Sequence, residues 1–512
     1  MKSPRGPITA GLAGIVLFLT LALVATGALA APKLQVAPLN PRLLEYLQEK
    51  AAGLEPEYLG PPGRVMKFRP SPIDFRHLNA ISVKALVTGK FPFPIPKPRP
   101  LKGLPAAFDW RAANGFNGIT PVKDQGSLGD CWAFGNLGAV EALYKISTGG
   151  HPDIDLSENN MASCQWPWLL GRDDGGNTAI AGSYLVTLFK KSPLLRGQKG
   201  ALLESKDPYS ASYHNSTLCG VSRPDPALRV DGFRWVAQNT AAMKTAIYNN
   251  GPLVTAFYYD DYYYDPSTFM YYLPGSSYSS NHEVLIVGWD DNKAHPGGKG
   301  CWIVKNSWGA DWGNQGYFYI PYNTGSVGED SMYYTSLRTF AANENLYMED
   351  LPGLVYPVGW RSATASGAIV FSVPNATENL THVEFYTTSN KAQYTVKVWD
   401  TVNESPTGVT FSNQLATIAG TCQEAGYYSI PLSAPVALTG GQQYGIEVKF
   451  HTPGYHYPLP TASGLSGLID GSFIGQGTAT SYGKGNAVRQ EFTRITYGAD
   501  TFAVCIRGRT SF

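Results

Sequence analysis

The hydrophobic pattern changes from helical to strand-like partway along the chain. After Cys131, apolar residues recur at helical spacing at Phe134, Leu137, Val140, Leu143 and Tyr144. We therefore expect a helix that begins at this cysteine. Capping signals and apolar spacing predict four further helices. These are Asn40–Leu47, a helix entered through Asp155–Asn160 that includes Cys164, Ala179–Lys190 and Ala241–Asn250.

Strand-length apolar runs separated by turn residues dominate the rest of the chain. In the central region they are Leu253–Tyr258, His282–Trp289, Cys301–Lys305 and Gly316–Ile320. From about residue 343 onward they recur at Ala368–Val373, His382–Thr387, Tyr394–Asp400, Gly426–Ile430, Tyr444–His451 and Thr501–Ile506. We predict an α+β fold class, with a half-helical, half-sheet domain at 104–342 and an all-β sandwich or jelly roll at 343–512.

The start of the chain has the pattern of an export signal. Lys2 and Arg5 precede a long apolar run, and Ala28-Leu29-Ala30 follows as a small-x-small cleavage site. We expect residues 1–30 to be a cleaved signal peptide. An uncleaved membrane anchor is the alternative, because the apolar run is long. A cleaved signal implies a secreted or extracellular protein, in which disulfides can form.

Residues 31–103 are predicted to be a pro-segment that ends in a proline-rich linker. The stretch 91–100 alternates proline with other residues and favours an extended polyproline II conformation. Such a linker is accessible to proteases. It separates the pro-segment from a globular unit that starts near residue 104.

Composition narrows the classes of function. The 512 residues carry a formal net charge of +1, which gives no electrostatic reason to expect nucleic acid or an anionic membrane as partner. No apolar segment after the signal is long enough to cross a bilayer, so we expect no membrane span in the mature chain. The sequence shows no metal-ligand cluster, P-loop or dinucleotide fingerprint, so we expect no metal and no other cofactor.

The stretch Asp124–Phe134 is a turn-rich loop that delivers Cys131 to the start of the predicted helix. The positive end of the helix macrodipole stabilises a thiolate at that position. This is the setting of a nucleophilic cysteine. A small buried core residue, or half of a disulfide, is the alternative.

Further side chains complete a candidate site for nucleophilic catalysis. His282 stands at the mouth of an apolar strand, where its imidazole can face a cleft. Asn306 ends the next apolar strand and can bond the imidazole, and Trp308 can shield that bond from water. Gln125 can project its amide into an oxyanion hole together with the backbone N–H of Cys131. The alternatives are a surface histidine and an asparagine that merely begins a turn.

Five short motifs occur in a characteristic order along the central region. They are Gln125-Gly126-Ser127 with Cys131-Trp132-Ala133-Phe134, then Leu156-Ser157-Glu158, Gly175-Gly176, Asn281-His282, and Lys305-Asn306-Ser307-Trp308-Gly309. In this order and spacing they resemble papain-like cysteine peptidases over about residues 104–340. The resemblance implies a helical lobe and a β-barrel-like lobe with the site between them.

The resemblance also implies a role for each residue. Cys131 attacks the peptide carbonyl, and His282 forms the thiolate–imidazolium pair and protonates the leaving amine. Asn306 orients the imidazole, and Gln125 stabilises the oxyanion. Gly175–Gly176 match the glycine pair whose backbone pairs with an extended substrate. The expected substrates are therefore proteins or peptides.

Glu283 and Ser336 match positions of the pocket that takes the second substrate residue before the scissile bond (S2) in this family. We hypothesise that Glu283 widens the preference at this position toward basic side chains. A side chain turned away from the pocket is the alternative. Together with the glycine pair and Trp308, these two residues make up the expected substrate-binding set.

The loop Asp124–Phe134, which we call the nucleophile loop, departs from the family pattern in two ways. Leu128 and Asp173 stand where the family has a pair of disulfide-bonded cysteines. Asp130 precedes the nucleophile, where serine is common. Its carboxylate raises the pKa of the thiol if it points inward but not if it faces solvent. We expect packing, rather than a disulfide, to hold this loop.

The remaining cysteines allow two disulfides. Cys164 and Cys219 match another disulfide of the family. Cys422 and Cys505 lie in the β-rich domain and can form a second, which would leave Cys301 as a free buried thiol. Sequence alone does not determine this connectivity.

Residues 345–507 resemble the lectin-like domain of some secreted prokaryotic cysteine peptidases, which implies cell-surface glycans as a further partner. Tyr258–Asp265 is interpreted as a hairpin of packed aromatics near the cleft rather than a calcium loop. The prediction is a secreted cysteine endopeptidase. One alternative is a surface adhesin or carbohydrate-binding protein whose peptidase unit is inert or merely self-processing. Another is a different Cys/His enzyme, such as a cell-wall amidase or a transglutaminase.

Overall fold

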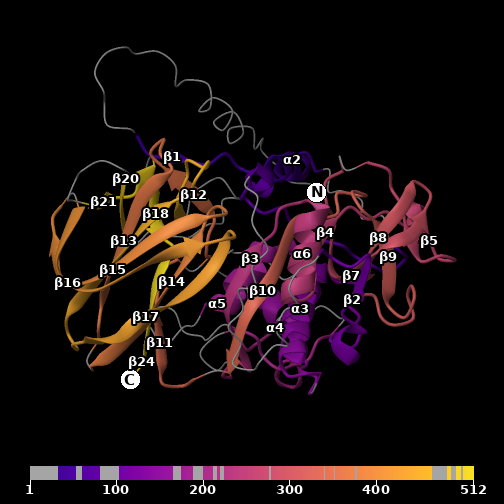
Figure 1. The fold of residues 1–512 in the computed structure, drawn as a ribbon, viewed down its shortest axis with the longest axis horizontal. Helices are drawn as coiled ribbons and strands as arrows, with labels where there is room; N and C mark the ends of the chain where they lie inside the picture. Colours follow the sequence, from indigo (N-terminus) through magenta and orange to yellow (C-terminus); the bar gives the residue numbers. More distant parts are fainter. Residues whose placement is uncertain are drawn as a thin grey trace, which may run out of the picture.

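The computed structural model shows two domains with an N-terminal segment laid across both (Figure 1). The described residues are 33–53, 60–80, 103–150, 152–164, 174–187, 200–210, 216–219, 224–275, 278–339, 341–350, 352–374, 377–406, 408–463, 481–485, 492–497 and 500–511. The predicted signal peptide at 1–30, the linker at 91–100 and Asp173 lie outside them.

The N-terminal segment, defined here as residues 33–80, contains strand β1 (Gln35–Val36), helix α2 (Pro41–Ala51) and the 3-10 turn η1 (Phe75–Ala80). Helix α2 starts where the sequence predicts a helix. The Asn40 side chain accepts a hydrogen bond from the Arg42 N–H at 3.1 Å, and proline occupies the first helical position. The segment is drawn in indigo along the top of Figure 1.

Helix α3 (Cys131–Ser147) is the central element of the first domain. Every residue of it except Tyr144 is buried. Gly135 and Gly138 face the sheet, where an added Cβ would make ordinary van der Waals contacts with Val254 at 3.4 Å and Leu285 at 3.5 Å. The other helices of this domain are η2 (Ala113–Gly115), α4 (Glu158–Ser163), α5 (Thr178–Val186), η5 (Glu204–Lys206), α6 (Thr240–Asn250) and η6 (Asp261–Tyr263).

Side-chain caps set the starts of the shorter helices. Ser157, Asn177 and Asn239 each accept a hydrogen bond from a backbone N–H three residues on, at 2.8–3.0 Å. The predicted helix through Cys164 stops one residue short of it, because Cys164 is the C-cap of α4. The predicted helix Ala179–Lys190 ends at Val186 as α5, and residues 188–190 lie outside the described residues.

The second half of the first domain is a sheet. Its strands are β2 (Ala107–Asp109), β3 (Leu228–Trp235), β4 (Leu253–Phe257), β5 (Tyr264–Asp265), β6 (Met270–Tyr271), β7 (His282–His295), β8 (Gly298–Lys305), β9 (Tyr317–Pro321) and β10 (Glu329–Thr339). The hydrophobic pattern predicted β4, β7, β8 and β9 and missed β3 and β10. Strands β7 and β8 form an antiparallel hairpin, with Leu285 opposite Lys305 and Trp289 opposite Trp302.

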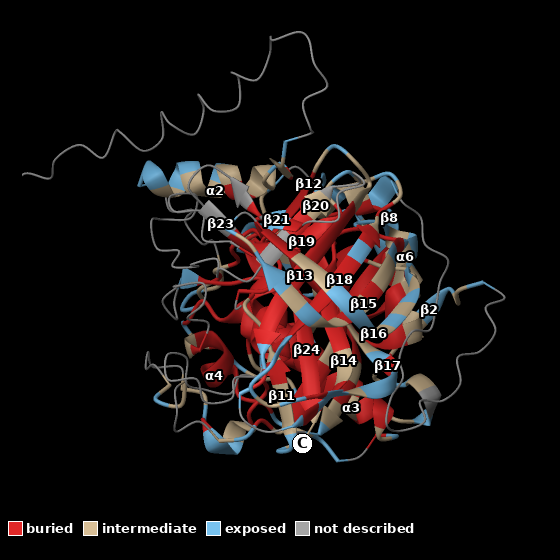
Figure 2. Ribbon diagram, turned by 90° about the vertical axis from the view of Figure 1, so that its left-hand side faces the viewer, coloured by how far each residue is buried: buried red, intermediate tan, exposed pale blue. Residues whose placement is uncertain are grey.

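The C-terminal domain is β-rich, as predicted. Its strands are β11 (Glu344–Tyr347), β12 (Tyr356–Gly359), β13 (Thr364–Ser372), β14 (Glu378–Thr387), β15 (Ala392–Glu404), β16 (Gly408–Cys422), β17 (Gly426–Leu438), β18 (Gln443–His451), β19 (Leu459–Ser463), β20 (Ser481–Gly485), β21 (Phe492–Arg494), β22 (Thr496–Tyr497), β23 (Asp500–Val504) and β24 (Ile506–Ser511). Six of them close a barrel in the order β13-β18-β15-β16-β21-β20. The outer surfaces of β15 and β16 alternate between intermediate and exposed residues, whereas the interior is buried (Figure 2).

The two domains share one sheet. Strand β17 pairs antiparallel with β3, with Gly426 opposite Arg234 and Tyr427 opposite Phe233. A Cβ on Gly426 would lie 2.1 Å from the Phe233 carbonyl oxygen, so only glycine permits this close pairing. The N-terminal segment joins both domains as well, because β1 pairs with β12. The domains are therefore connected by backbone hydrogen bonds at two places.

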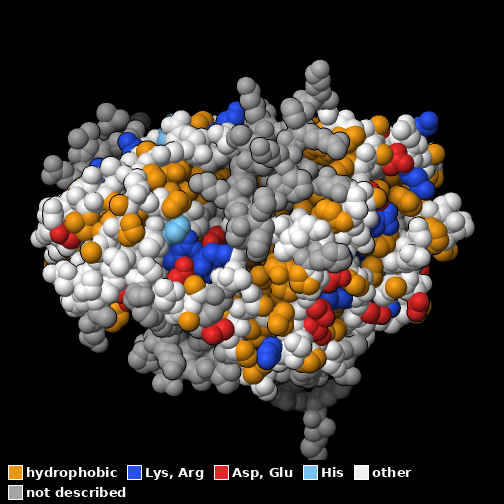
Figure 3. Space-filling model, turned by 60° about the horizontal axis from the view of Figure 1, so that its bottom comes forward, with side chains coloured by type: hydrophobic (Ala, Val, Ile, Leu, Met, Phe, Trp, Pro, Cys, Tyr) orange, Lys and Arg blue, Asp and Glu red, His pale blue; other side chains and the backbone are white. Residues whose placement is uncertain are grey.

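Acidic and basic side chains form small mixed groups on the face shown in Figure 3, between larger hydrophobic and uncharged areas. This face has no extended field of one sign, which agrees with a net charge of +1. Within the part of the chain that the structure describes, no helix combines the length and apolar character needed to cross a bilayer.

Candidate active site

The nucleophile loop ends at Cys131, the first residue of α3, whose side chain is completely buried. The Gln125 N–H donates to the Ser307 carbonyl oxygen at 2.8 Å. The Tyr209 hydroxyl oxygen lies 2.9 Å from the Gln125 carbonyl oxygen and 3.0 Å from the Asp130 carboxylate, so its single proton is shared between these two acceptors. One tyrosine hydroxyl thus joins the two ends of the loop that carries Gln125 and Cys131.

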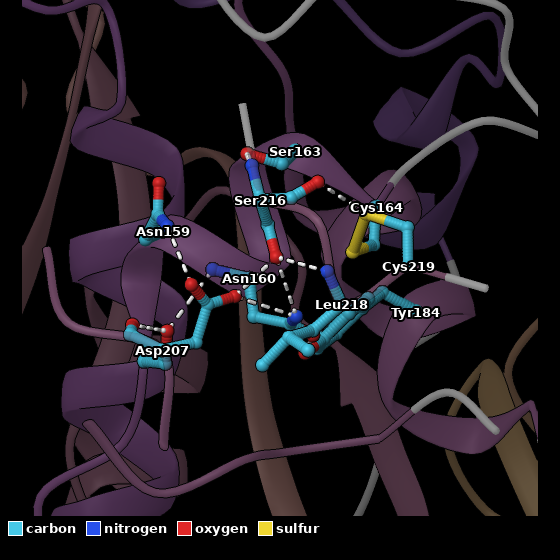
Figure 4. Close-up of a disulfide and its surroundings, with 10 residues drawn as sticks. Asn159, Asn160, Ser163, Cys164, Tyr184, Asp207, Ser216, Leu218 and Cys219 are labelled. Carbon is cyan, nitrogen blue, oxygen red and sulfur yellow. Dashed lines mark hydrogen bonds between the residues drawn. A yellow bond between two sulfur atoms is a disulfide. The ribbon is translucent and has the colours of Figure 1, made fainter. Parts of the chain in front are cut away.

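Asp207, two residues before Tyr209, belongs to a buried polar cluster (Figure 4). The Asp207 carboxylate accepts a hydrogen bond from the Asn160 amide at 2.8 Å. Close by, Cys164 and Cys219 form a disulfide with a Cα–Cα distance of 5.1 Å. The disulfide that the family resemblance implied is therefore present, and it secures the chain near the residue that holds the loop.

His282 and Asn306 meet because they end neighbouring strands. His282 is the first residue of β7, Asn306 follows β8, and the β7–β8 pairing brings the two strand ends side by side. The His282 Nε2 lies 2.9 Å from the Asn306 Oδ1. The Trp308 ring stacks on the imidazole with centroids 4.8 Å apart and planes at 20°. This bond requires a proton on Nε2. The buried Nδ1, which lacks a hydrogen-bond partner among the described residues, is then free to exchange a proton.

The Gln125 side-chain amide is oriented by its neighbours. Its Oε1 accepts a hydrogen bond from the Ser307 hydroxyl at 2.6 Å. Its Nε2 donates to the Leu128 carbonyl oxygen at 2.7 Å and to the Val65 carbonyl oxygen at 2.9 Å. The amide N–H therefore already binds a peptide carbonyl that comes from the N-terminal segment.

The N-terminal segment covers the nucleophile as an extended strand. The Phe68 N–H donates to the Asn281 carbonyl oxygen at 3.1 Å, and the Arg69 N–H donates to the Gly176 carbonyl oxygen at 2.9 Å. In return, the Gly176 N–H donates to the Lys67 carbonyl oxygen at 3.3 Å. Phe68 and Gly176 thus form a parallel β-bridge beside the buried thiol.

The glycine pair is required for this contact. Gly175 has φ +78°, and a Cβ on it would lie 2.3 Å from the Lys67 carbonyl oxygen. A Cβ on Gly176 would lie 2.4 Å from the Trp132 ring. A side chain at either position would push the bound strand or the tryptophan away. Glycine at both positions therefore leaves room for an extended chain to pair with this backbone.

The covered site holds a neutral thiol and a neutral imidazole. Burial, followed by the nearby Glu283, raises the pKa of the Cys131 thiol to about 12. Burial lowers the pKa of His282 to about 4, although the bond to Asn306 favours the charged form. With the N-terminal segment in place, the pair is not in the thiolate–imidazolium state that nucleophilic attack requires.

Glu283 faces helix α3 rather than an open pocket. Its carboxyl is completely buried and accepts a hydrogen bond from the Asn136 amide at 2.6 Å. Burial, helped by Asp330, raises the pKa of Glu283 well above its ordinary range. Ser336 lies on β10 opposite Gly232, and the hydroxyl that reaches Asn136, at 2.7 Å, comes from Tyr334. An uncharged Glu283 offers no free charge to a basic substrate side chain.

Asp130 points inward. It is completely buried, so the alternative of a solvent-facing carboxylate is wrong. It adds to the rise of the Cys131 pKa as a smaller contribution after burial and Glu283. Leu128, in place of the family's cysteine, is buried in the loop, and hydrogen bonds from Gln125 and Tyr209 supplement its packing.

The second predicted disulfide is not formed. Cys422 and Cys505 are both free and buried. The Cys422 thiol lies near Arg234 and Tyr428 at the end of β16, whereas Cys505 lies beside Asp350 between β23 and β24. Their different surroundings, which the sequence does not reveal, keep the two sulfurs apart. Cys301 is free and buried, as expected.

The tyrosine-rich stretch contains packed aromatics near the cleft, as interpreted from the sequence, but it is not one hairpin. It includes the 3-10 turn η6, where Tyr262 is 86% exposed, and only Tyr264–Asp265 form a strand, which pairs with β6. Tyr259 is buried and meets the Trp308 ring edge-on at 4.9 Å. Tyr264 stacks on Trp312 at 4.8 Å. These rings support the tryptophan that covers the His282–Asn306 bond.

Sequence reasoning missed Tyr209, Ser307 and residues 64–69 as parts of this site. Ser307 lies inside the Lys305-Asn306-Ser307-Trp308-Gly309 motif, which is the signal that could have indicated it. Tyr209 lies in an irregular stretch without periodicity. The segment 64–69 has no regular pattern of its own, because its order comes from the cleft that it fills.

A cysteine at a helix start, a paired histidine and asparagine, and an oriented glutamine amide between two lobes define the class of papain-like cysteine proteases. Residues 104–336 match the family described as papain family cysteine protease, and residues 346–510 match the lectin like domain. The chain therefore has a papain-family cysteine protease domain followed by a lectin-like domain.

Part of the chain resembles curated cysteine proteases in sequence. Cysteine proteinase 1 of Dictyostelium discoideum is 31% identical over 249 residues, covering 46% of this chain and 66% of that protein. Cathepsin K of Gallus gallus is 34% identical over 229 residues, covering 43% and 59%. The chain thus spans less than two thirds of the length of these curated relatives.

The fold extends over both domains of a solved structure. The protease and lectin-like domains of Cwp84, a surface layer associated protein of Clostridium difficile, superimpose with a TM-score of 0.72 at 21% identity, covering 94% of this chain and 99% of that chain. Cwp84 after propeptide cleavage gives a TM-score of 0.65 at 23% identity, covering 79% and 99%. At these identities the likeness is one of fold.

Proposed function

We propose that this protein is a secreted cysteine endopeptidase made as an inactive precursor. The observation that carries the proposal is the Val65 carbonyl oxygen bound at 2.9 Å by the Gln125 amide, beside Cys131. A peptide carbonyl thus sits on the donor that an oxyanion hole would use. The secreted location rests on the predicted signal peptide.

The proposed reaction follows from the protein's own donors and acceptors. His282 takes the thiol proton at Nδ1, and the Cys131 thiolate attacks the carbonyl carbon of the substrate. The Gln125 amide and the Cys131 N–H stabilise the oxyanion. The imidazolium then protonates the leaving amine, and water hydrolyses the thioester. Asn306 fixes the ring orientation throughout, and Trp308 keeps water from the bond between them.

The N-terminal segment is proposed to be the inhibitor of the precursor. It fills the cleft, buries the thiol and leaves the thiol and imidazole uncharged. Cleavage in the proline-rich linker at 91–100 is proposed to release it. Mature substrates would replace it as extended peptides along Gly175–Gly176.

The C-terminal domain is proposed to bring the protease to glycans at a cell surface. This part rests on the lectin-like architecture alone.

One experiment tests the catalytic proposal against its competitors. The activated protein and its Cys131→Ala variant are assayed on casein and on purified peptidoglycan. We expect casein cleavage that the variant abolishes. Turnover of peptidoglycan only would favour a cell-wall amidase, and turnover of neither would favour an adhesin with an inert protease unit.

The S2 hypothesis for Glu283 is tested by a peptide library that varies the second residue before the scissile bond. The hypothesis expects a gain for arginine or lysine over leucine, which Glu283→Ala removes. Because the structure buries Glu283 against Asn136, a profile without this gain would show that the carboxyl supports helix α3 and does not select substrates.

A further inference from the structure

Arg64 of the N-terminal segment binds next to the nucleophile loop, in a site that Asp124 and the Trp308 carbonyl oxygen form and that we call the seat. Its guanidinium donates to both carboxylate oxygens of Asp124, one of them at 3.1 Å, and to the Trp308 carbonyl oxygen at 3.0 Å. Bidentate pairing of this kind matches the planar fork of an arginine. The Asp124 side chain remains 48% exposed beside it.

The seat is formed by the protease domain. Asp124 and Trp308 are joined by an antiparallel β-bridge, which fixes their backbones relative to each other. The Asp124 Oδ1 also accepts a hydrogen bond from the Gly126 N–H at 2.8 Å, which orients the carboxylate. Partial burial alone would raise the pKa of this carboxyl, but the bonds from Arg64 and Gly126 hold it below its ordinary value. The carboxylate is therefore charged with Arg64 in place, and the Gly126 N–H of its own loop orients it.

The position of the seat identifies which part of a substrate would reach it. Phe68 bridges to Gly176 on one side of the thiol, and Arg64 lies on the other side of the Val65 carbonyl. The Trp308 ring stacks on His282, the group proposed to protonate the leaving amine. Asp124 and Trp308 therefore flank the leaving-group half of the cleft.

We propose that Asp124 and the Trp308 carbonyl oxygen form a subsite that selects an arginine or lysine C-terminal to the scissile bond. The inference rests on the proposed function and names its substrate class: protein chains with a basic residue shortly after the cleaved bond. Beside Trp308, whose ring meets Trp312 edge-on at 4.9 Å, a cavity of about 460 Å³ is lined by Tyr264 and Trp312 and, in the precursor, by Pro61 of the N-terminal segment. It gives the following residues room once that segment is gone. Arg64 would occupy this subsite in the precursor, as a substrate side chain would in the mature enzyme.

The test is a set of peptides that vary each position after the scissile bond, cleaved by the activated protein. We expect kcat/KM for arginine or lysine to exceed that for alanine by about fivefold at one position, as for a partly exposed charged pair. Asp124→Asn keeps the acceptor for the Gly126 N–H but removes the charge, so this preference should disappear. Asp124→Lys should invert it toward glutamate.

Asp290→Asn is the matched control. Asp290 accepts a hydrogen bond at 2.8 Å from the N–H of Asn292, two residues on, as Asp124 does from Gly126, but it lies within strand β7 away from His282. This variant should keep the basic preference.

The wild-type profile decides the proposal even if a variant fails to fold. Cleavage with no basic preference at any position after the scissile bond overturns the subsite while the endopeptidase function stands. A preference that survives in Asp124→Asn also overturns it, because another group must then supply the charge. If the activated protein cleaves no peptide at all, the proposed function fails and the subsite fails with it.

Discussion

At the scale of single residues, the Cys131 thiol and the His282 imidazole are both uncharged while the N-terminal segment covers them. Burial under the N-terminal segment leaves His282 neutral down to about pH 4 and Cys131 protonated up to about pH 12. Both groups ionise more readily in water, at ordinary values of 6.5 and 9.0. The stability of the covered state therefore depends on pH at both ends of the range.

The sign of this dependence gives a prediction. The folded pKa of His282 is depressed, so acid protonates the uncovered form first, and the covered state loses stability as pH falls from about 6.5 to 4. The loss should be on the order of 3 kcal/mol at the acid end. In the Cys131→Ala chain, which cannot cleave itself, proteolysis of the N-terminal segment by an added protease should accelerate over this range.

His282→Gln in the same Cys131→Ala background is the control for that measurement. It removes the titrating imidazole, so most of the acceleration between pH 6.5 and 4 should vanish. An unchanged pH profile would assign the effect to another buried base, such as His77 of the segment, whose pKa burial also lowers. Glu329 and Asp330 would act in the opposite direction, because burial raises their pKa values and acid then favours the covered state.

Sequence reasoning placed the candidate catalytic residues because each stands at an element boundary. Cys131 begins a helix, His282 begins a strand and Asn306 follows one, and the pattern showed all three elements. It did not find Tyr209, because a tyrosine in an irregular stretch gives no signal until the tertiary fold brings it to the loop. Nor did it reveal that Cys422 and Cys505 stay apart.

At the scale of elements, the nucleophile loop is held by a tyrosine where the family has a disulfide. The Tyr209 hydroxyl bonds both ends of the loop, and its ring meets Phe134 edge-on at 4.9 Å. We predict that Tyr209→Phe keeps the ring contact but loosens the loop. The free energy of unfolding should fall by about 1–2 kcal/mol, because the buried Asp130 loses a donor. The kcat should fall as well, because Gln125 and Cys131 lose their relative position.

Tyr322→Phe is the matched control for the loop. Its hydroxyl donates to an aspartate, Asp291, at 2.6 Å, but on the far hairpin. We expect a similar change in stability, measured by urea denaturation, without a change in kcat. Equal effects of the two variants on kcat would show that Tyr209 has no special link to the loop.

Strands β3 and β10 show why part of the fold escaped prediction. Strand β3 carries Arg229 and Asp231 in a nearly buried strand, so its pattern is not apolar. Asp231 pairs with Arg338 of strand β10 at 2.6 Å and with Arg509 of the C-terminal domain at 3.1 Å. Arg229 lies 3.1 Å from Glu344 of the C-terminal domain. A strand whose charges are paired across a domain boundary cannot be recognised from its own residues.

At the scale of the whole molecule, the lectin-like domain is continuous with the protease domain. Besides the shared sheet, the completely buried Arg507 donates to Asp350 at 2.8 Å and to the Val186 carbonyl oxygen of α5 at 2.9 Å. We predict that Arg507→Met lowers the free energy of unfolding by about 3–5 kcal/mol, since it leaves a buried carboxyl without its partner. Urea denaturation monitored by tryptophan fluorescence measures the loss.

The exposed pair of Arg76 and Asp74 provides the comparison for that prediction. Arg76→Met should cost less than about 1 kcal/mol, because water screens this pair. If Arg507→Met cost no more than Arg76→Met, the buried Arg507, which bonds Asp350 within its own domain and the Val186 carbonyl oxygen across the boundary, would not stabilise the domain junction.

The central claim joins all three scales: Cys131 is the nucleophile, His282 activates it, and the N-terminal segment keeps it covered. The most direct measurement is peptide mapping of the residue labelled by an epoxide inhibitor of papain-type thiols, before and after removal of that segment. We predict labelling at Cys131 that is at least about tenfold faster after removal and is lost in His282→Gln. Labelling of Cys301, Cys422 or Cys505 instead, or equal rates before and after removal, would contradict the account.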